Sequence, residues 1–327
     1  LMGQVNQTWT LKGNEHLSDG NIDFEHIEVA QVVSGNASID AGNTSGSGND
    51  AFTVFGSGAV NVNAQGIDFY SVNSVTLDTT DTVTDDNTGT YAYELESDSA
   101  MNVLGISFSS GAFGNFNWGT NDTLALSDNH NIATDTLINA KNAQLLGSAG
   151  VDTFTVTDSN ALDFTLGNQN LVKFSNVSTV DALGGTDIVT GSLGTDWLLT
   201  GTDNQAINHG ITFDGVQQLV ANNAGVVALD GASETFIING AGNVDVHNGV
   251  VANKMNITGL NKVTLKDGED SVSDSADLDY VLSSDTIMSV GGIEFNGLAV
   301  QSNYGWGAGD TLALASGHSV SGTVAAS

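Results

Sequence analysis

The sequence predicts an all-β fold, a right-handed parallel β-helix (a β-solenoid) of roughly 16 coils. Short runs alternate apolar side chains with polar or small ones, as residues 154–156 and 162–166 do, which is the pattern of half-buried strands. Gly, Asn and Asp separate these runs, and these residues tolerate the positive φ of tight corners. The chain contains no Pro, as expected where nearly every strand is paired on both sides.

A long tandem repeat organises the chain, because residues 101–130 recur as residues 288–318. The offset of about 188 residues predicts a first period at residues 1–188 and a second, incomplete period at residues 189–327. Matched residues include Trp9 and Trp197, Val75 and Val263, Ile106 and Ile293, Phe108 and Phe295, Trp118 and Trp306, Asp122 and Asp310, and His130 and His318. We expect one continuous solenoid that is part of a longer protein.

A shorter pattern recurs about every 40 residues and is clearest at residues 67–75 and 172–180. Two coils of about 20 residues each fit this spacing. Tandem Ig-like β-sandwiches are the alternative, but an Ig domain of about 100 residues is too long for the repeat. Residues 134–146 have some helical character and predict a short excursion from the coils.

The composition is strongly acidic, with 38 Asp and Glu against 6 basic residues, all of them Lys, and a net charge of −32. This argues against nucleic acid and anionic membranes as partners, because both require a basic patch. The absence of Cys excludes disulfides, thiolate metal sites and Cys nucleophiles. The sequence contains no run of about 18 apolar residues, so no membrane span is expected. The N-terminus lacks the pattern of a signal peptide.

Gly-x-Asp units are the motifs most suggestive of a metal. Gly185 and Gly194 open two such units at the spacing of nonapeptide β-roll repeats, which bind Ca²⁺ through oxygen ligands. However, the preceding Gly-Gly is mostly missing, and the nine-residue step occurs only once. The alternative is that each Asp caps the backbone of its own turn. The calcium candidates are Asp50, Asp152, Asp187, Asp196, Asp203 and Asp270.

Aromatic residues in the two long repeats suggest a contact surface for sugar rings or a neighbouring molecule. The candidates are Phe116, Trp118, Tyr304 and Trp306. The alternative is a loop that leaves the coil and folds over the side of the solenoid. His130 and His318 are interpreted as turn residues, because no other His lies near them in the sequence and no zinc spacing is present.

Catalysis is not expected. A polysaccharide lyase on acidic sugars needs a basic residue and cationic groups for the uronate, and this chain has no Arg and few Lys. An inverting hydrolase needs one unique pair of carboxylates, whereas the acids here follow the repeat. A β-helical polysaccharide-degrading enzyme is therefore a remote alternative.

Residues 150–156 (Gly-Val-Asp-Thr-Phe-Thr-Val) and 185–191 (Gly-Thr-Asp-Ile-Val-Thr-Gly) resemble the repeats of giant bacterial surface and secreted proteins. The resemblance is to filamentous-haemagglutinin-like two-partner-secretion exoproteins and β-strand-repeat adhesins, and more weakly to S-layer and RTX proteins. It implies a non-catalytic segment of an adhesin shaft, surface fibre or surface layer at the bacterial cell surface. Its expected partners are other copies or domains of the same protein, the cell surface or glycans.

No cofactor is expected to be required, and calcium is the one candidate. The rival function is a calcium-dependent module that binds glycans or a cell surface.

Overall fold

The computed structural model describes most of the chain. The described residues are 1–3, 6–13, 16–32, 37–41, 50–62, 66–202, 204–228, 233–248, 254–266, 270–297, 304–305, 309–317 and 321. They form β-strands joined by turns, with a single 3₁₀ turn, η1 (Phe113–Asn115), and no α-helix among them. The all-β prediction is therefore confirmed.

The chain divides into two compact units. Unit 1 comprises residues 1–146 and 169–176, and unit 2 comprises residues 147–168 and 177–327. In each unit the strands stack as the coils of a β-solenoid, and the chain passes back and forth between two sheets. The boundary between these two units follows the packing of the chain and is a different quantity from the sequence period of about 188 residues.

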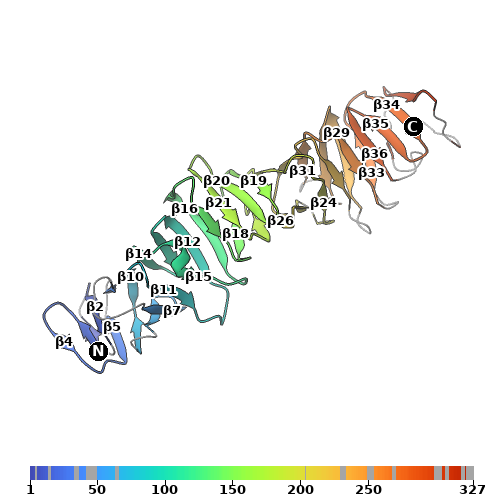
Figure 1. The fold of residues 1–327 in the computed structure, drawn as a ribbon. Coiled ribbons are helices and arrows are strands. Elements are labelled where there is room, and N and C mark those ends of the chain that lie inside the picture. The colour runs from blue at the N-terminus through green and yellow to red at the C-terminus, as the bar shows by residue number, and fades with distance from the viewer. Residues whose placement is uncertain are drawn as a thin grey trace. The chain divides into compact units, whose positions relative to one another are not determined.

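Unit 1 contains sheet A, in the order β1-β5-β9-β8-β7-β11-β15, and a sheet B portion that runs β4-β3-β2-β6-β10-β14-β13-β12-β16-β18. Figure 1 shows β10, β14, β12 and β16 as neighbours in this unit. The strands are β1 (Met2–Gly3), β2 (Thr8–Gly13), β3 (His16–Ser18), β4 (Asp23–Phe24), β5 (Val29–Val32), β6 (Ala37–Asp40), β7 (Ala51–Gly56), β8 (Ala59–Val62), β9 (Ile67–Tyr70), β10 (Val72–Thr76), β11 (Thr82–Asp85), β12 (Ala92–Ser97), β13 (Ala100–Val103), β14 (Ile106–Ser109), β15 (Phe116–Asn117), β16 (Thr123–Asn131), β17 (Leu137–Asn139), β18 (Gln144–Leu146) and β21 (Leu171–Ser175), which pairs with β17.

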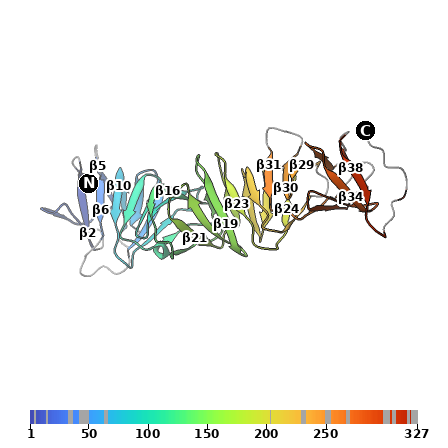
Figure 2. The same ribbon diagram turned by 90° about the horizontal axis from the view of Figure 1, so that it is seen from above.

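Unit 2 contains sheet C, in the order β20-β19-β23-β27-β31-β30-β29-β33-β37, and a sheet B portion that runs β22-β26-β25-β24-β28-β32-β36-β35-β34-β38. Figure 2 shows β31, β30 and β29 as neighbours in this unit. The strands are β19 (Asp152–Asp158), β20 (Ala161–Leu166), β22 (Thr179–Asp181), β23 (Ile188–Thr190), β24 (Trp197–Leu199), β25 (Ala206–Asn208), β26 (Ile211–Asp214), β27 (Gln218–Val220), β28 (Gly225–Val227), β29 (Thr235–Gly240), β30 (Asn243–His247), β31 (Met255–Thr258), β32 (Lys262–Thr264), β33 (Ser271–Asp274), β34 (Asp279–Ser284), β35 (Ile287–Val290), β36 (Ile293–Asn296), β37 (Tyr304–Gly305) and β38 (Thr311–Leu314).

The coils are not purely parallel. In unit 1, β12, β13 and β14 form an antiparallel triplet. The chain reverses direction after β12 and again after β13, and β14 then pairs in parallel with β10. Strands β12 and β16 then pair in parallel. Strands β29, β30 and β31 form an equivalent triplet in unit 2. The repeat of about 40 residues is thus one antiparallel triplet followed by single strands that cross between the sheets.

These triplets lengthen the sequence distance between stacked strands. Ser74 pairs in parallel with Ser38, and Ile257 pairs in parallel with Leu219. Most such partners lie further apart than the roughly 20 residues per coil that the sequence predicted. The reason is that the antiparallel strands are inserted between coils, a feature that alternating hydrophobicity alone does not reveal.

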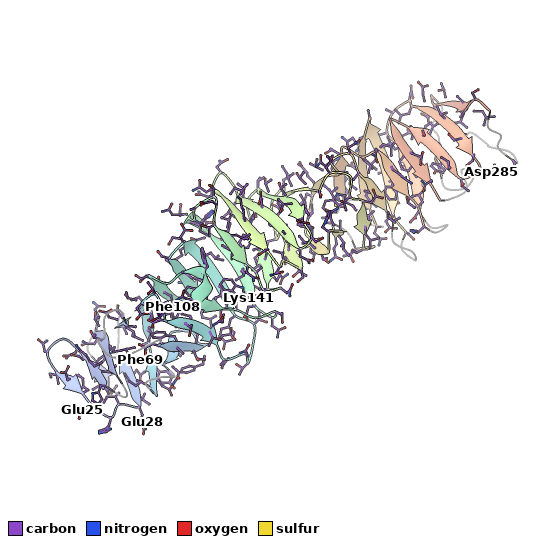
Figure 3. All side chains as sticks on the ribbon, viewed as in Figure 1. Glu25, Glu28, Phe69, Phe108, Lys141 and Asp285 are labelled. Atoms are coloured by element: carbon purple, nitrogen blue, oxygen red, sulfur yellow. The ribbon has the colours of Figure 1, made fainter. Side chains whose placement is uncertain are left out.

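The core consists of apolar rows that run from strand to strand. In sheet B of unit 1 the row passes through Val75, Phe108, Met101, Leu95 and Leu126. In sheet B of unit 2 the same register joins Val263, Phe295, Met288 and Leu282, all buried, and ends at Leu314, which is exposed. The identical register confirms that the sequence repeat is also a structural repeat. Figure 3 labels Phe69 and Phe108, which belong to the two sheets of unit 1.

The helical character expected for residues 134–146 is not observed. They contain β17 and β18, not a helix. Ile138 and Leu145 are buried in these strands, with Leu145 opposite Leu124 of β16. Tertiary pairing therefore outweighs the weak helical propensity of this stretch.

Candidate functional site at the coil corners

Buried acidic residues recur where strands of sheets A and C begin. Asp50 precedes β7 and Asp81 precedes β11, and the backbone N–H of Asp50 donates to Asp81 Oδ1 at 3.0 Å. The N–H of Thr82 in turn donates to the carbonyl oxygen of Asp50 at 2.9 Å. The Asp81 carboxylate therefore takes the place of a backbone carbonyl and extends the parallel ladder by one rung.

The same arrangement is repeated twice in unit 2. The N–H of Asp152 donates to Asp187 Oδ1 at 2.9 Å, and the N–H of Glu234 donates to Asp270 Oδ1 at 3.2 Å. All six acids of the three pairs, Asp50 and Asp81, Asp152 and Asp187, and Glu234 and Asp270, are buried. Each pair joins two stacked coils.

The second carboxylate oxygen commonly caps a turn of the same coil. Asp81 Oδ2 accepts the N–H of Asp78 at 2.8 Å, and Asp270 Oδ2 accepts the N–H of Lys266 at 2.9 Å. Asp152 Oδ2 accepts the N–H of Ser148 at 2.5 Å. This is the turn-capping role that the sequence analysis set against calcium binding. Asp187 is different, because its Oδ2 is buried and has no hydrogen-bond partner among the described residues.

Burial raises the pKa of two of these acids. The pKa of Asp187 is raised to about 6, mainly by desolvation and also by the nearby charge of Asp152. The pKa of Asp81 is likewise raised to about 6 by desolvation, with Asp78 and Asp50 contributing. Both groups therefore change charge in a mildly acidic range where an exposed Asp does not.

A second kind of acidic pair links the two sheets of unit 1. Asp85 ends β11 of sheet A, and Asp122 precedes β16 of sheet B. Burial is the main cause that raises the pKa of Asp122, and the charge of Asp85 adds to it. Tyr93 Oη donates to Asp85 Oδ2 at 2.8 Å, while Asp122 accepts the N–H groups of Tyr91 and Gly119 at 3.0 and 2.5 Å.

Unit 2 contains the equivalent pair at the repeat offset. Asp274 ends β33, and Asp310 precedes β38. Tyr280 Oη donates to Asp274, and Asp310 Oδ1 accepts the N–H of Leu278 at 2.9 Å. Burial is again the main cause of a raised pKa, here that of Asp274. The residues of the long repeat thus build the same acidic pair in both units.

Most of these partners were not predicted from the sequence. Asp50, Asp152, Asp187 and Asp270 were calcium candidates, but Asp81, Glu234, and Asp85 and Asp274 of the sheet-linking pairs were not. An acid immediately before, or at the end of, an alternating run was the available signal. The structure places two candidates elsewhere: Asp196 is exposed and accepts the N–H of Gly225 at 2.7 Å, and Asp203 lies outside the described residues.

Metal binding has no preformed cluster in the described part of the chain. No group of three His, Asp or Glu residues is arranged there to hold a metal ion. Nor does any helix in the described ranges have the length and apolar character needed to cross a membrane.

The aromatic candidates do not form an exposed platform. Phe116 is 1% exposed and Trp118 is 4% exposed, and Trp118 Nε1 donates to the carbonyl oxygen of Ala140 at 3.0 Å. Lys141 Nζ lies over the Trp118 ring, 5.2 Å from its centroid, and Figure 3 labels Lys141. Tyr304 is 7% exposed. Trp306 lies outside the described residues.

This burial corrects two interpretations. The premise of a stacking surface for sugars, which is exposure, fails for Phe116, Trp118 and Tyr304. A loop outside the coil is also wrong for residues 116–117, because they form β15, which pairs with β11 in sheet A. The rings of Phe116 and Trp118 fill the core of the coil, and Asn117 between them is exposed.

His130 is buried between coils. Its Nδ1 lies 3.0 Å from the carbonyl oxygen of Ser127, and its Nε2 lies 3.2 Å from that of Asn170. His130 lies within β16 and not in a turn, and its contacts agree with a structural role. His318 lies outside the described residues.

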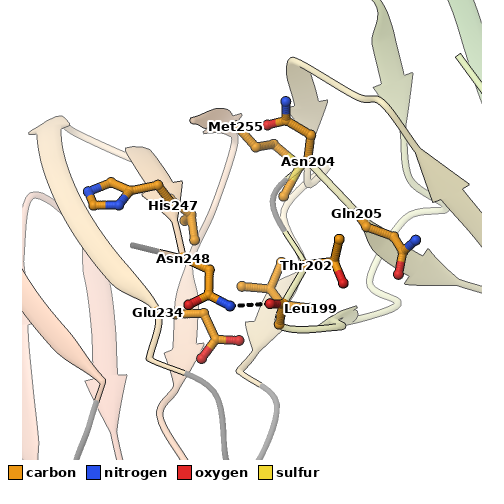
Figure 4. Close-up of a pocket in the computed structure, with 10 residues that line it drawn as sticks. Leu199, Thr202, Asn204, Gln205, Glu234, His247, Asn248 and Met255 are labelled. Carbon is orange, nitrogen blue, oxygen red and sulfur yellow. Dashed lines mark hydrogen bonds between the residues drawn. The ribbon is translucent and has the colours of Figure 1, made fainter. Parts of the chain in front are cut away.

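A small pocket in unit 2 lies beside Glu234 and is shown in Figure 4. It is lined by Leu199, Gly201, Thr202, Asn204, Gln205, Glu234, Val246, His247, Asn248 and Met255. Its volume is about 10 Å³, which is about enough for one water molecule and too small for a sugar. Asn204 Oδ1 and His247 Nδ1 are buried without a hydrogen-bond partner among the described residues, so a single water suits this pocket.

Comparisons with known proteins give no relative for the chain. No protein-family model, no curated protein and no solved structure matches it.

Proposed function

We propose that the chain is a structural, non-catalytic segment of a large extracellular bacterial protein, such as an adhesin shaft, a surface fibre or a surface-layer element. The observation that carries this proposal is the repeated coil itself. The same side-chain register recurs in both units, so the long repeats serve to build coils. In such an array stability accumulates through contacts between neighbouring coils.

The chemistry of the described surface supports the same role. A net charge of −32 limits lateral aggregation and keeps crowded copies apart. The proposed partners are other copies or domains of the same protein and the cell surface. The coils are proposed to be right-handed, as crossovers between parallel strands almost always are. The expected total of roughly 16 coils assumed about 20 residues per coil, and the wider spacing of stacked partners such as Leu219 and Ile257 favours fewer coils.

A calcium-dependent glycan-binding module is the weaker proposal. It requires exposed aromatic rings, and the described candidates are buried. No cofactor is proposed to be required. Calcium keeps one argument in its favour, the unsatisfied Oδ2 of Asp187.

Small-angle X-ray scattering on the purified chain tests the shaft role. A globular protein of this length has a radius of gyration of about 20 Å, and a shaft is expected to exceed that value clearly. A radius of gyration near the globular value contradicts the proposal. Binding of Trp118→Ala and unmodified chains to a glycan array tests the rival, which requires binding that the substitution abolishes.

A further inference from the structure

The outer face of sheet A in unit 1 carries two aromatic rings that the coil does not bury. Tyr70 of β9 is 37% exposed, and Phe55 of β7 is half-buried. Their rings meet edge-on, with centroids 5.7 Å apart and planes at 84°. Their neighbours along the strands, Phe69 and Val54, are buried and point inward. Because side chains alternate along a strand, the two exposed rings lie on the outer face.

Backbone pairing brings the two rings together. Tyr70 lies opposite Ala59 of β8, which in turn pairs with β7 beside Phe55. The small side chain of Ala59 stands between the two aromatic residues and is only 7% exposed. The N–H of Val72 donates to the carbonyl oxygen of Gly58 at 2.9 Å, which fixes the turn between β7 and β8 beside the start of β10. The backbone that carries the rings is therefore held in place without a ligand.

A polar pair lies next to the rings on the same face. Asn61 and Asp68 stand directly opposite each other on β8 and β9, and Asn61 Nδ2 donates to Asp68 Oδ1 at 2.6 Å. Both side chains are half-buried. Asp68 is two residues from Tyr70 along β9, which places the two side chains about 7 Å apart on one side of the strand. Stacking and hydrogen-bonding groups are thus adjacent on this face.

The equivalent triplet of unit 2 shows that the coil does not need these rings. Strands β29, β30 and β31 pair in the same register as β7, β8 and β9, and a backbone hydrogen bond to Gly242 fixes their hairpin in the same way. In this register Asn239 takes the place of Phe55, and Thr258 takes the place of Tyr70. The same backbone is built there with small polar side chains, so the aromatic pair is an addition to one triplet.

These groups suit a neutral sugar. The C–H face of a pyranose ring packs on an aromatic ring, and its hydroxyl groups need both donors and acceptors, which an amide and a carboxylate supply together. The net charge of −32 repels anionic sugars. A quaternary ammonium group also packs on aromatic rings, but it has no hydrogen bond to make with Asn61 or Asp68.

We propose that the outer face of β7, β8 and β9 is a binding site for a neutral oligosaccharide. Tyr70 stacks on a sugar ring, Phe55 supports the Tyr70 ring through the edge-on contact, and the polar pair of Asn61 and Asp68 binds hydroxyl groups. The site uses neither calcium nor Trp118. It does not depend on the shaft role, because the coil of unit 2 forms without the two rings.

The test replaces each ring by the residue that unit 2 has at the same place, in the variants Tyr70→Thr and Phe55→Asn. Both variants are expected to fold, because the equivalent triplet carries these side chains in the same register, and thermal denaturation checks this. Leu198→Thr is the matched control, since Leu198 of β24 is also 37% exposed. Cellohexaose, maltohexaose and chitohexaose are the probes, titrated by calorimetry and by saturation-transfer NMR.

The unmodified chain is expected to bind at least one of these probes with a Kd of about 1 mM or below. Tyr70→Thr is expected to weaken that binding by about tenfold or more, and Phe55→Asn by a smaller factor. Leu198→Thr is expected to leave it unchanged. The proposal is overturned if no probe binds up to roughly 10 mM. It is equally overturned if both ring substitutions leave the binding unchanged.

Choline and an alginate oligosaccharide separate sugar recognition from charge. Neither is expected to bind, since choline makes no hydrogen bonds to the polar pair and alginate is anionic. Choline binding that Tyr70→Thr abolishes, without binding of a neutral probe, identifies a cation site and overturns the sugar assignment. Tighter binding of alginate than of the neutral probes overturns it as well. X-ray scattering on the same chain tests the shaft role independently of these results.

Discussion

Asp187 accepts the backbone N–H of Asp152, a residue of the neighbouring coil, at 2.9 Å through Oδ1, while its buried Oδ2 has no hydrogen-bond partner among the described residues. The carboxyl group therefore acts as part of the backbone ladder on one side and as an unsatisfied acid on the other. This combination makes the stability of the coil depend on pH.

Stability is expected to be greatest in mildly acidic solution. The folded-state pKa of Asp81 and of Asp187 is about 6, above the ordinary value of 3.8, so their stabilising protonation is present at low pH and is lost as the pH rises through about 6. Each group is expected to contribute about 1–3 kcal/mol to this loss. Urea denaturation from about pH 4 to pH 8 measures it.

Other acids set the lower limit of this range. Hydrogen bonds hold the pKa of Asp78 and Asp86 below the ordinary value, so the stability they contribute is lost as the pH falls through their folded-state pKa. We therefore expect a maximum of unfolding free energy between about pH 4 and pH 6. A curve that rises steadily up to about pH 8 contradicts this expectation.

The substitution Gly185→Ala is expected to destabilise unit 2 strongly. Gly185 has φ +127°, and an added Cβ would overlap with the carbonyl oxygen of Gly150, so the backbone must shift. We expect a loss of at least about 2 kcal/mol in unfolding free energy. Gly194→Ala is the matched control, because Gly194 has φ +73° and open space around it, and it is expected to cost only about 1–2 kcal/mol. Similar losses in both variants contradict the packing argument.

Trp118→Ala is expected to lower the free energy of unfolding by about 3–5 kcal/mol, because it empties a buried site and removes a hydrogen bond. Thermal or urea denaturation measures this loss. Leu193→Ala is the control, since Leu193 is 72% exposed and a change there is expected to stay within about 0.5 kcal/mol. A Trp118→Ala chain of unchanged stability is inconsistent with the buried position.

Added salt is expected to stabilise the chain. The net charge of −32 makes the folded surface repel itself, and this repulsion is screened as the Debye length falls from about 30 Å at 0.01 M to about 3 Å at 1 M. The melting temperature in NaCl is expected to rise over this range, with KCl as a control for ion-specific effects. A constant or falling melting temperature would show that the surface charges are already balanced locally.

The sequence by itself determined the strand content, the repeat and the apolar rows. Alternating apolar residues such as Phe154 and Val156 share one buried face only if the segment is a strand. Identical residues at the repeat offset, such as Phe108 and Phe295, occupy corresponding positions in the strand register. Corner acids such as Asp152 were also identifiable, because Gly-x-Asp marks a turn.

Only the tertiary structure decided which strands run back and which acids meet. The antiparallel return of β13 between β12 and β14 depends on pairing across coils, and a period of two is the same for parallel and antiparallel strands. Asp85 and Asp122 are far apart in the sequence, and the charge of Asp85 affects the pKa of Asp122 because two sheets close on each other. Trp118 is buried for the same reason, since the coil that covers it is formed by distant residues such as Ala140.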